Sequence, residues 1–106
     1  LIDDIIIPFK DNAEFSSNYI FPIVLKNSSQ EQRDSTREKL AALGIQTSVH
    51  YPAVHRFSIY KKYASSLKNT EYVTDNLITL PMYSKLSVKD VNYVCDELIN
   101  CLRNGN

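Results

Sequence analysis

The chain has few of the residues on which several common classes of protein depend. Of its 106 residues, two are glycine, two are cysteine and none is tryptophan. The glycines, Gly44 and Gly105, are too few for a glycine-rich phosphate loop, and no Gly-x-Ser-x-Gly motif marks a nucleophilic serine. Cys95 and Cys101 lie about 240° apart around an expected helix, so they face different directions. We therefore expect no self-contained hydrolase and no disulfide framework, and we interpret both cysteines as buried thiols.

Excess charge and long apolar runs are also missing. Twelve basic and twelve acidic side chains cancel, so no long-range field would attract nucleic acid or an anionic membrane. No run approaches the roughly 18 apolar residues that span a bilayer, and residues 1–8 lack the basic flank of a secretory signal. These features predict a cytoplasmic domain with no nucleic-acid or membrane partner. The start at Leu1, without methionine, favours a piece of a longer protein.

What the sequence does contain is a set of short periodic segments. Residues 19–25 alternate as a strand, and Pro22 favours an edge position for it because proline donates no ladder hydrogen bond. Ser28 and Glu31 form a capping-box pattern that begins a helix ending at Leu43, with Gly44 as its left-handed C′ residue. Apolar residues occur only late in this helix, so we expect its first turns to be solvated.

The second half of the chain repeats this alternation of strands and helices. Residues 45–51 alternate as another strand that Pro52 ends, and residues 53–68 read as a loop with a short helical turn. Asn69 or Thr70 is expected to cap a helix through residue 76, and residues 77–80 form a short buried strand. Ser87 and Asp90 begin a final helix with an apolar stripe that must pack on a sheet. The predicted fold is one α+β domain, with a small sheet of about three strands and two or three helices packed on it.

The chain's only histidines, His50 and His55, bracket a proline-containing turn. Their spacing matches no recognised metal motif, and zinc would need further ligands. One interpretation is structural, with His50 filling a sheet face and His55 solvated in a loop. The other is functional, because imidazole and phenol groups at a strand end can bind a polyhydroxylated or phosphorylated ligand. Lys61 and Lys62 beside tyrosines are interpreted as a solvated turn rather than a nucleic-acid site.

Several blocks of sequence, in register and in order over residues 19–102, resemble the C-terminal domain of the DegT-type sugar aminotransferases. The blocks are LAALGI at 40–45, HYP at 50–52 with His55, LPM at 80–82, and Asp90-Val91. One departure is Thr70 before Glu71, where many relatives carry alanine. This resemblance implies the small domain of a type I aminotransferase, which helps to close an active site over a nucleotide-linked keto-sugar.

The resemblance further implies that pyridoxal phosphate is the cofactor, bound by a missing large N-terminal domain, so that this fragment alone is catalytically silent. It places His50, Tyr51 and His55 near the sugar-nucleotide substrate, with glutamate as amino donor, and it implies a homodimeric complete enzyme. We expect residues 1–18 to be a lead-in from the large domain, residues 19–102 the small domain and residues 103–106 a tail.

Two alternatives remain open at this point. The chain could be a stand-alone α+β binding module that uses the loop from His50 to His55 and performs no chemistry. It could also be the small domain of an amino-acid aminotransferase, which would require an arginine to bind the substrate α-carboxylate. Arg56 is the one arginine near the loop.

Overall fold

A computed structural model of the chain describes residues 3–104. It contains a three-stranded antiparallel sheet in the order β1-β2-β3, formed by β1 (Ile5–Ile6), β2 (Phe21–Leu25) and β3 (Leu77–Leu80). The helices are α1 (Gln30–Ala42), α2 (Lys68–Asn76) and α3 (Val88–Arg103), and three 3₁₀ helices are η1 (Lys10–Phe15), η2 (Val54–Arg56) and η3 (Ser58–Tyr63). The predicted α+β class, with a small sheet and helices packed on it, is confirmed.

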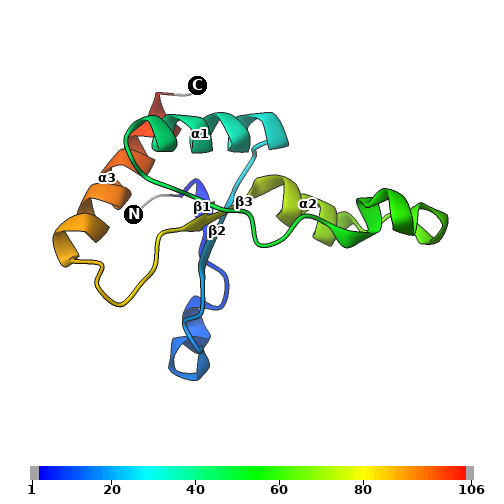
Figure 1. The fold of residues 1–106 in the computed structure, drawn as a ribbon, viewed down its shortest axis with the longest axis horizontal. Helices are drawn as coiled ribbons and strands as arrows, with labels where there is room; N and C mark the ends of the chain where they lie inside the picture. Colours follow the sequence, from blue (N-terminus) through cyan, green and yellow to red (C-terminus); the bar gives the residue numbers. More distant parts are fainter. Residues whose placement is uncertain (1–2, 105–106) are drawn as a thin grey trace.

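The hydrophobic core lies between the sheet and two of the helices. Ile23 and Leu25 from β2, and Ile78 and Leu80 from β3, project to the same face because alternate residues of a strand share a face. Leu40 from α1 and a stripe of α3 (Val94, Leu98 and Cys101) pack against them. Helix α3 lies on the opposite side of the strands from α2 (Figure 1). The expected packing of the final helix on the sheet is confirmed.

Residues 45–51, which the alternation predicts to be a strand, do not form one. Only Ser48 pairs, in a bridge with Thr79 whose two backbone hydrogen bonds are 2.7 and 3.1 Å long. The neighbouring carbonyl of Thr47 instead accepts a hydrogen bond of 3.1 Å from the Arg37 guanidinium, which takes the place of a ladder partner. The third strand is β1, whose Ile5 and Ile6 pair with Leu25 and Val24.

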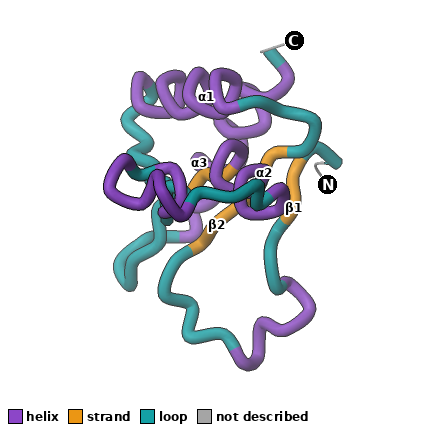
Figure 2. Tube along the Cα trace, turned by 90° about the vertical axis from the view of Figure 1, so that its right-hand side faces the viewer, coloured by secondary structure: helices purple, strands orange, loops and turns teal. Residues whose placement is uncertain are grey.

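The expectation that Pro22 lies on an edge strand is wrong, because β2 is the central strand. Pro22 is tolerated there for a local reason. It pairs with Thr79 of β3, while β1 pairs only with Val24 and Leu25 and ends before reaching it. The connection between β1 and β2, which contains η1, extends away from the sheet (Figure 2).

The helix boundaries follow the sequence signals, with shifts at two starts. The N-cap of α1 is Ser29, not Ser28, and it forms a reciprocal capping box with Gln32. Helix α2 begins at Lys68 without a side-chain cap, so neither Asn69 nor Thr70 has the predicted role. The capping box of Ser87 and Asp90 is confirmed, and so is the positive φ of Gly44, at 79°.

The cysteines differ from each other in their surroundings. Cys101 is buried in the core as predicted, and its burial raises the pKa of its thiol. Cys95 is exposed on α3, contrary to the prediction, because the buried stripe of that helix passes through positions 94, 98 and 101. A spacing of three or four residues keeps these three positions on one face, and position 95 falls beside it.

Candidate functional site

The segment 50–56 runs from the bridge at Ser48 to the short helix η2 and lies against α2. Three side chains on one face of α2 hold it, at the spacing i, i+3 and i+4. The Thr74 hydroxyl donates to the Tyr51 carbonyl at 3.0 Å. The Glu71 carboxylate lies 3.0 Å from His55 Nε2. We call residues 50–56 the loop, and α2 fixes its shape at both ends.

The third contact joins Arg56 to Asp75. Both terminal nitrogens of the guanidinium donate to the two carboxylate oxygens, with one distance of 3.0 Å. This arrangement lowers the pKa of Asp75 and raises that of Arg56, mainly through the hydrogen bonds of the pair. Because a carboxylate of the same chain already occupies the guanidinium fork, Arg56 does not present a free fork to a substrate carboxylate.

His50 is held from the opposite side, by the sheet. Its Nδ1 lies 3.0 Å from the Thr79 hydroxyl, and its ring meets the Tyr51 ring edge-on with 4.8 Å between centroids. Within residues 3–104, Nε2 of His50 has no hydrogen-bond partner. The Tyr51 side chain is 65% exposed. The loop therefore offers one imidazole nitrogen and one phenol to the surroundings.

His55 is not the solvated loop residue of the structural interpretation. Its side chain is only 13% exposed. The hydrogen bond from His55 lowers the pKa of Glu71, and the Leu67 backbone N–H, which donates to the same carboxylate at 3.3 Å, adds to this effect. The three residues predicted from the sequence, His50, Tyr51 and His55, line one groove of about 740 Å³.

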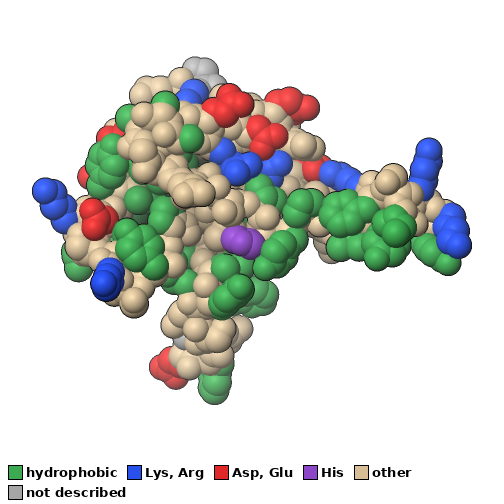
Figure 3. All heavy atoms as spheres, viewed as in Figure 1, with side chains coloured by type: hydrophobic (Ala, Val, Ile, Leu, Met, Phe, Trp, Pro, Cys, Tyr) green, Lys and Arg blue, Asp and Glu red, His purple; other side chains and the backbone are tan. Residues whose placement is uncertain are grey.

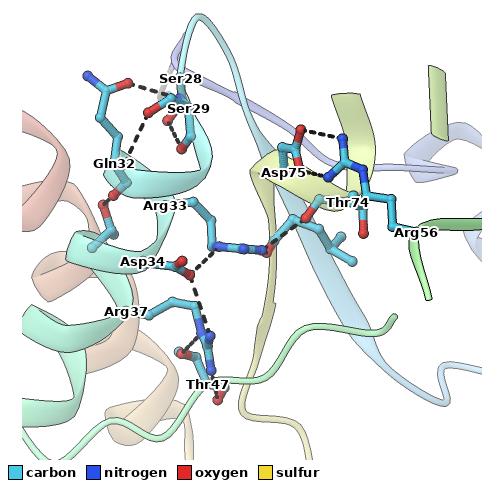
Figure 4. A network of polar contacts seen from close by, with 12 residues as sticks. Ser28, Ser29, Gln32, Arg33, Asp34, Arg37, Thr47, Arg56, Thr74 and Asp75 are labelled. Atoms are coloured by element: carbon cyan, nitrogen blue, oxygen red, sulfur yellow. Dashed lines mark hydrogen bonds and ion pairs between the residues drawn. The ribbon is translucent and has the colours of Figure 1, made fainter. Parts of the chain in front are cut away.

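Sequence reasoning missed Arg33, which binds backbone carbonyls at the C-terminal end of α2. Arg33, on α1, is 5% exposed, although the first turns of this helix were expected to be solvated. Its guanidinium donates to the carbonyls of Thr74 and Leu77, at 3.0 and 3.2 Å, and pairs with Asp34 (Figure 4). The available signal was the stripe that Arg33 shares with Thr36 and Leu40, all of which are buried.

A substitution of Glu71 tests the contact with His55 through its pH dependence. The pKa of Glu71 is lowered in the fold, so its ionised form stabilises the fold above its ordinary pKa, and this contribution is lost as the pH falls through the lowered value. Urea unfolding of wild type and Glu71→Gln at about pH 6 and about pH 3 measures this term. The variant should lose less stability than wild type between the two pH values. An equal loss of unfolding free energy in both proteins would show that the contact between Glu71 and His55 does not stabilise the fold.

The residues of this chain do not by themselves fit pyridoxal phosphate. That cofactor requires a lysine amine held inside a site, and all eight lysines of the chain are exposed. Residues 3–104 also contain no cluster of three or more histidine, cysteine, aspartate or glutamate side chains that could hold a metal ion. Within the same residues, no helix has the length and apolarity needed to cross a membrane.

The chain is similar to known aminotransferases in sequence and in fold. The profile of the DegT/DnrJ/EryC1/StrS aminotransferase family matches residues 2–99. The UDP-4-amino-4,6-dideoxy-N-acetyl-beta-L-altrosamine transaminase of Campylobacter jejuni is 30% identical over 89 residues, covering 82% of this chain and 24% of that protein. The dTDP-4-dehydro-2,3,6-trideoxy-D-glucose 4-aminotransferase of Saccharopolyspora spinosa is 29% identical over 90 residues, covering 85% and 22%.

Solved structures agree with these matches. The aminotransferase TlmJ of Streptoalloteichus hindustanus superposes with a TM-score of 0.85 at 25% identity, covering 99% of this chain and 28% of that one. A Streptococcus pneumoniae protein described as a sugar aminotransferase, solved in PLP and PMP forms, gives 0.76 at 28% identity, covering 86% and 24%. Pyridoxal phosphate is the cofactor of the family.

This chain belongs to the DegT/DnrJ/EryC1/StrS aminotransferase family. It spans about a quarter of the length of the curated relatives that it matches.

Proposed function

We propose that this chain is the C-terminal, small domain of a pyridoxal-phosphate-dependent aminotransferase that transfers an amino group from glutamate to a nucleotide-linked keto-sugar. Its role would be in the synthesis of cell-surface polysaccharide or of deoxyamino sugars. Family membership and the names of two relatives, which specify UDP- and dTDP-linked sugars, support this proposal. The observation that carries it is the geometry of the loop. Contacts with α2 and β3 fix the loop beside a groove, and His50 and Tyr51 line that groove.

In this proposal a large N-terminal domain binds the cofactor, and this chain alone is inactive. Every lysine of the chain is exposed, which agrees with a division in which another part of the protein holds the cofactor. Residues 1–18 lead in from the large domain and add strand β1 to the sheet, residues 19–102 form the rest of the small domain, and residues 103–106 are its tail. The complete enzyme is a cytoplasmic homodimer.

The three loop residues have distinct proposed contacts with the substrate. Nε2 of His50 and the Tyr51 hydroxyl are free for directional hydrogen bonds to sugar hydroxyls or to phosphate oxygens. His55 approaches the substrate through Nδ1, because Nε2 is engaged by Glu71. The contacts that α2 and Thr79 of β3 make keep these groups in place before the substrate arrives, which lowers the cost of ordering them on binding.

The visible spectrum of the complete natural gene product, including everything upstream of Leu1, tests this function. The proposal predicts a yellow protein with the visible absorption band of bound pyridoxal phosphate, and a shift of this band on addition of glutamate. A nucleotide-linked keto-sugar should then restore the original band. A colourless product of about this length would instead favour a stand-alone binding module.

Arg56→Ala in the complete enzyme separates this function from that of an amino-acid aminotransferase. Because Asp75 already pairs with Arg56, we expect the rate of the glutamate half-reaction to change by no more than about fivefold, the cost of losing one exposed ion pair. Asp75→Asn, which breaks the same pair but keeps the guanidinium, is the matched control. If Arg56→Ala alone abolishes the reaction with glutamate, Arg56 binds the α-carboxylate and the alternative is correct.

A further inference from the structure

Residues 57–67, which we call the arm, form an extension that the rest of the chain leaves uncovered. The arm contains η3, and it projects from the body of the molecule beyond the end of α2 (Figure 1). Every one of its residues is exposed. Its hydrogen bonds within the described residues are all local, such as Tyr60 N–H to the Phe57 carbonyl at 2.9 Å and Ala64 N–H to the Lys61 carbonyl at 3.2 Å.

The exposed side chains of the arm are unusually apolar. Its five large apolar side chains are between 42% and 74% exposed: Phe57, Ile59, Tyr60, Tyr63 and Leu67. On the projecting arm, apolar side chains (green) gather along one edge, and basic side chains (blue) lie on the other edge and at the tip (Figure 3). An exposed apolar surface rimmed by charged residues is typical of a contact with a protein, a membrane or a ligand.

The apolar edge is continuous with the proposed substrate loop. Tyr60, Tyr63 and Leu67 line the same groove as Tyr51 and His55. Whatever covers the arm therefore also faces the loop. Under the proposed function, the loop holds the sugar that reacts at the cofactor, so the loop faces the part of the enzyme that binds the cofactor.

The overall shape of the chain also indicates a partner. The radius of gyration is 14.9 Å, whereas a compact domain of this length would have about 13 Å. The curated relatives are about four times longer than the matched segment, since it covers 24% and 22% of them. The length of the relatives outside the match and the projecting arm both favour a further part of the same polypeptide as the partner.

We propose that the arm is a docking strap, which lies across the cofactor-bearing domain of the same polypeptide and buries Tyr60, Tyr63 and Leu67 against it. This inference rests on the proposed function. The strap joins the two domains next to the substrate loop, so that the position of the loop is set by both α2 and the large domain. A second copy of the chain is the competing occupant.

A photo-crosslink from the arm of the complete protein distinguishes these occupants. Ile59, 74% exposed, is replaced by p-benzoylphenylalanine, and the purified protein is irradiated and analysed by gel and mass spectrometry. The proposal predicts a product of monomer mass in which the arm is joined to a peptide from upstream of Leu1. A product of dimer mass would assign the arm to a second copy, and the absence of any product would show a free arm; either result overturns the proposal.

Two controls keep this test separate from the proposed function. The same replacement at Val88, 77% exposed at the start of α3, measures background crosslinking at a site of equal exposure outside the arm. The visible band of pyridoxal phosphate and its response to glutamate are recorded on each variant before irradiation. A crosslink-negative protein that keeps this response would overturn the docking strap alone, whereas a colourless protein would overturn the proposed function.

Discussion

Replacing Arg33 by methionine should lower the free energy of unfolding by about 3 kcal/mol, because the change leaves two buried carbonyls unpaired. Arg33 donates to the carbonyls of Thr74 and Leu77, at the junction where α2 ends and β3 begins. Methionine fills a similar volume but donates no hydrogen bond. The midpoint of urea unfolding, with an unchanged slope, measures the loss.

Arg37→Met is the matched control for this prediction. Arg37 lies one turn further along α1 and also donates two hydrogen bonds, both to Thr47 at 3.1 Å, but its side chain is 32% exposed. Water can replace a partner there, so we expect a loss of about 1 kcal/mol. If both substitutions lower the free energy of unfolding by the same amount, burial does not explain the contribution of the Arg33 hydrogen bonds.

The second large effect is expected at the centre of the core. Leu40 is completely buried between α1, the sheet and α3, and truncation to alanine removes its contacts and leaves a cavity. Leu40→Ala should cost about 3 to 4 kcal/mol, within the range of buried leucine truncations. Leu43→Ala, where the side chain is 40% exposed at the end of the same helix, should cost about 1 kcal/mol or less. Equal unfolding midpoints for the two variants would contradict the packing described here.

The parts of the fold that could be predicted are those fixed by local chemistry. The capping box at Ser87 and the left-handed Gly44 depend on a few neighbouring residues, and both are confirmed. The prediction of a strand at 45–51 was wrong, because alternation of apolar and polar residues shows only that a segment could pair in a sheet. Whether it does pair depends on competing partners from other elements, and here Arg37 of α1 donates to the Thr47 carbonyl.

The candidate site also has a part that could be predicted from the sequence and a part that could not. The residue types at 50, 51 and 55 indicated a polar loop beside a strand end, and the structure brings all three onto one groove. The side chains that hold them are Glu71 and Thr74 of α2 and Thr79 of β3. Hydrogen bonds between residues more than fifteen positions apart leave no periodic trace in the sequence, so these partners could not be predicted.

The two half-reactions of the complete enzyme test the central claim most directly, measured separately for wild type and Tyr51→Ala. Truncating Tyr51 should leave the fold intact, because Tyr51 is 65% exposed and its contact with Thr74 is made by the Tyr51 backbone carbonyl. Phe15→Ala, which removes an aromatic ring that is 91% exposed outside the loop, is the control.

We predict that Tyr51→Ala raises the KM for the nucleotide-linked keto-sugar about tenfold, the cost of one lost hydrogen bond and ring contact, and leaves the glutamate half-reaction unchanged. Unchanged kinetics in both half-reactions, or an equal loss in both, would contradict the claim that this loop binds the sugar nucleotide.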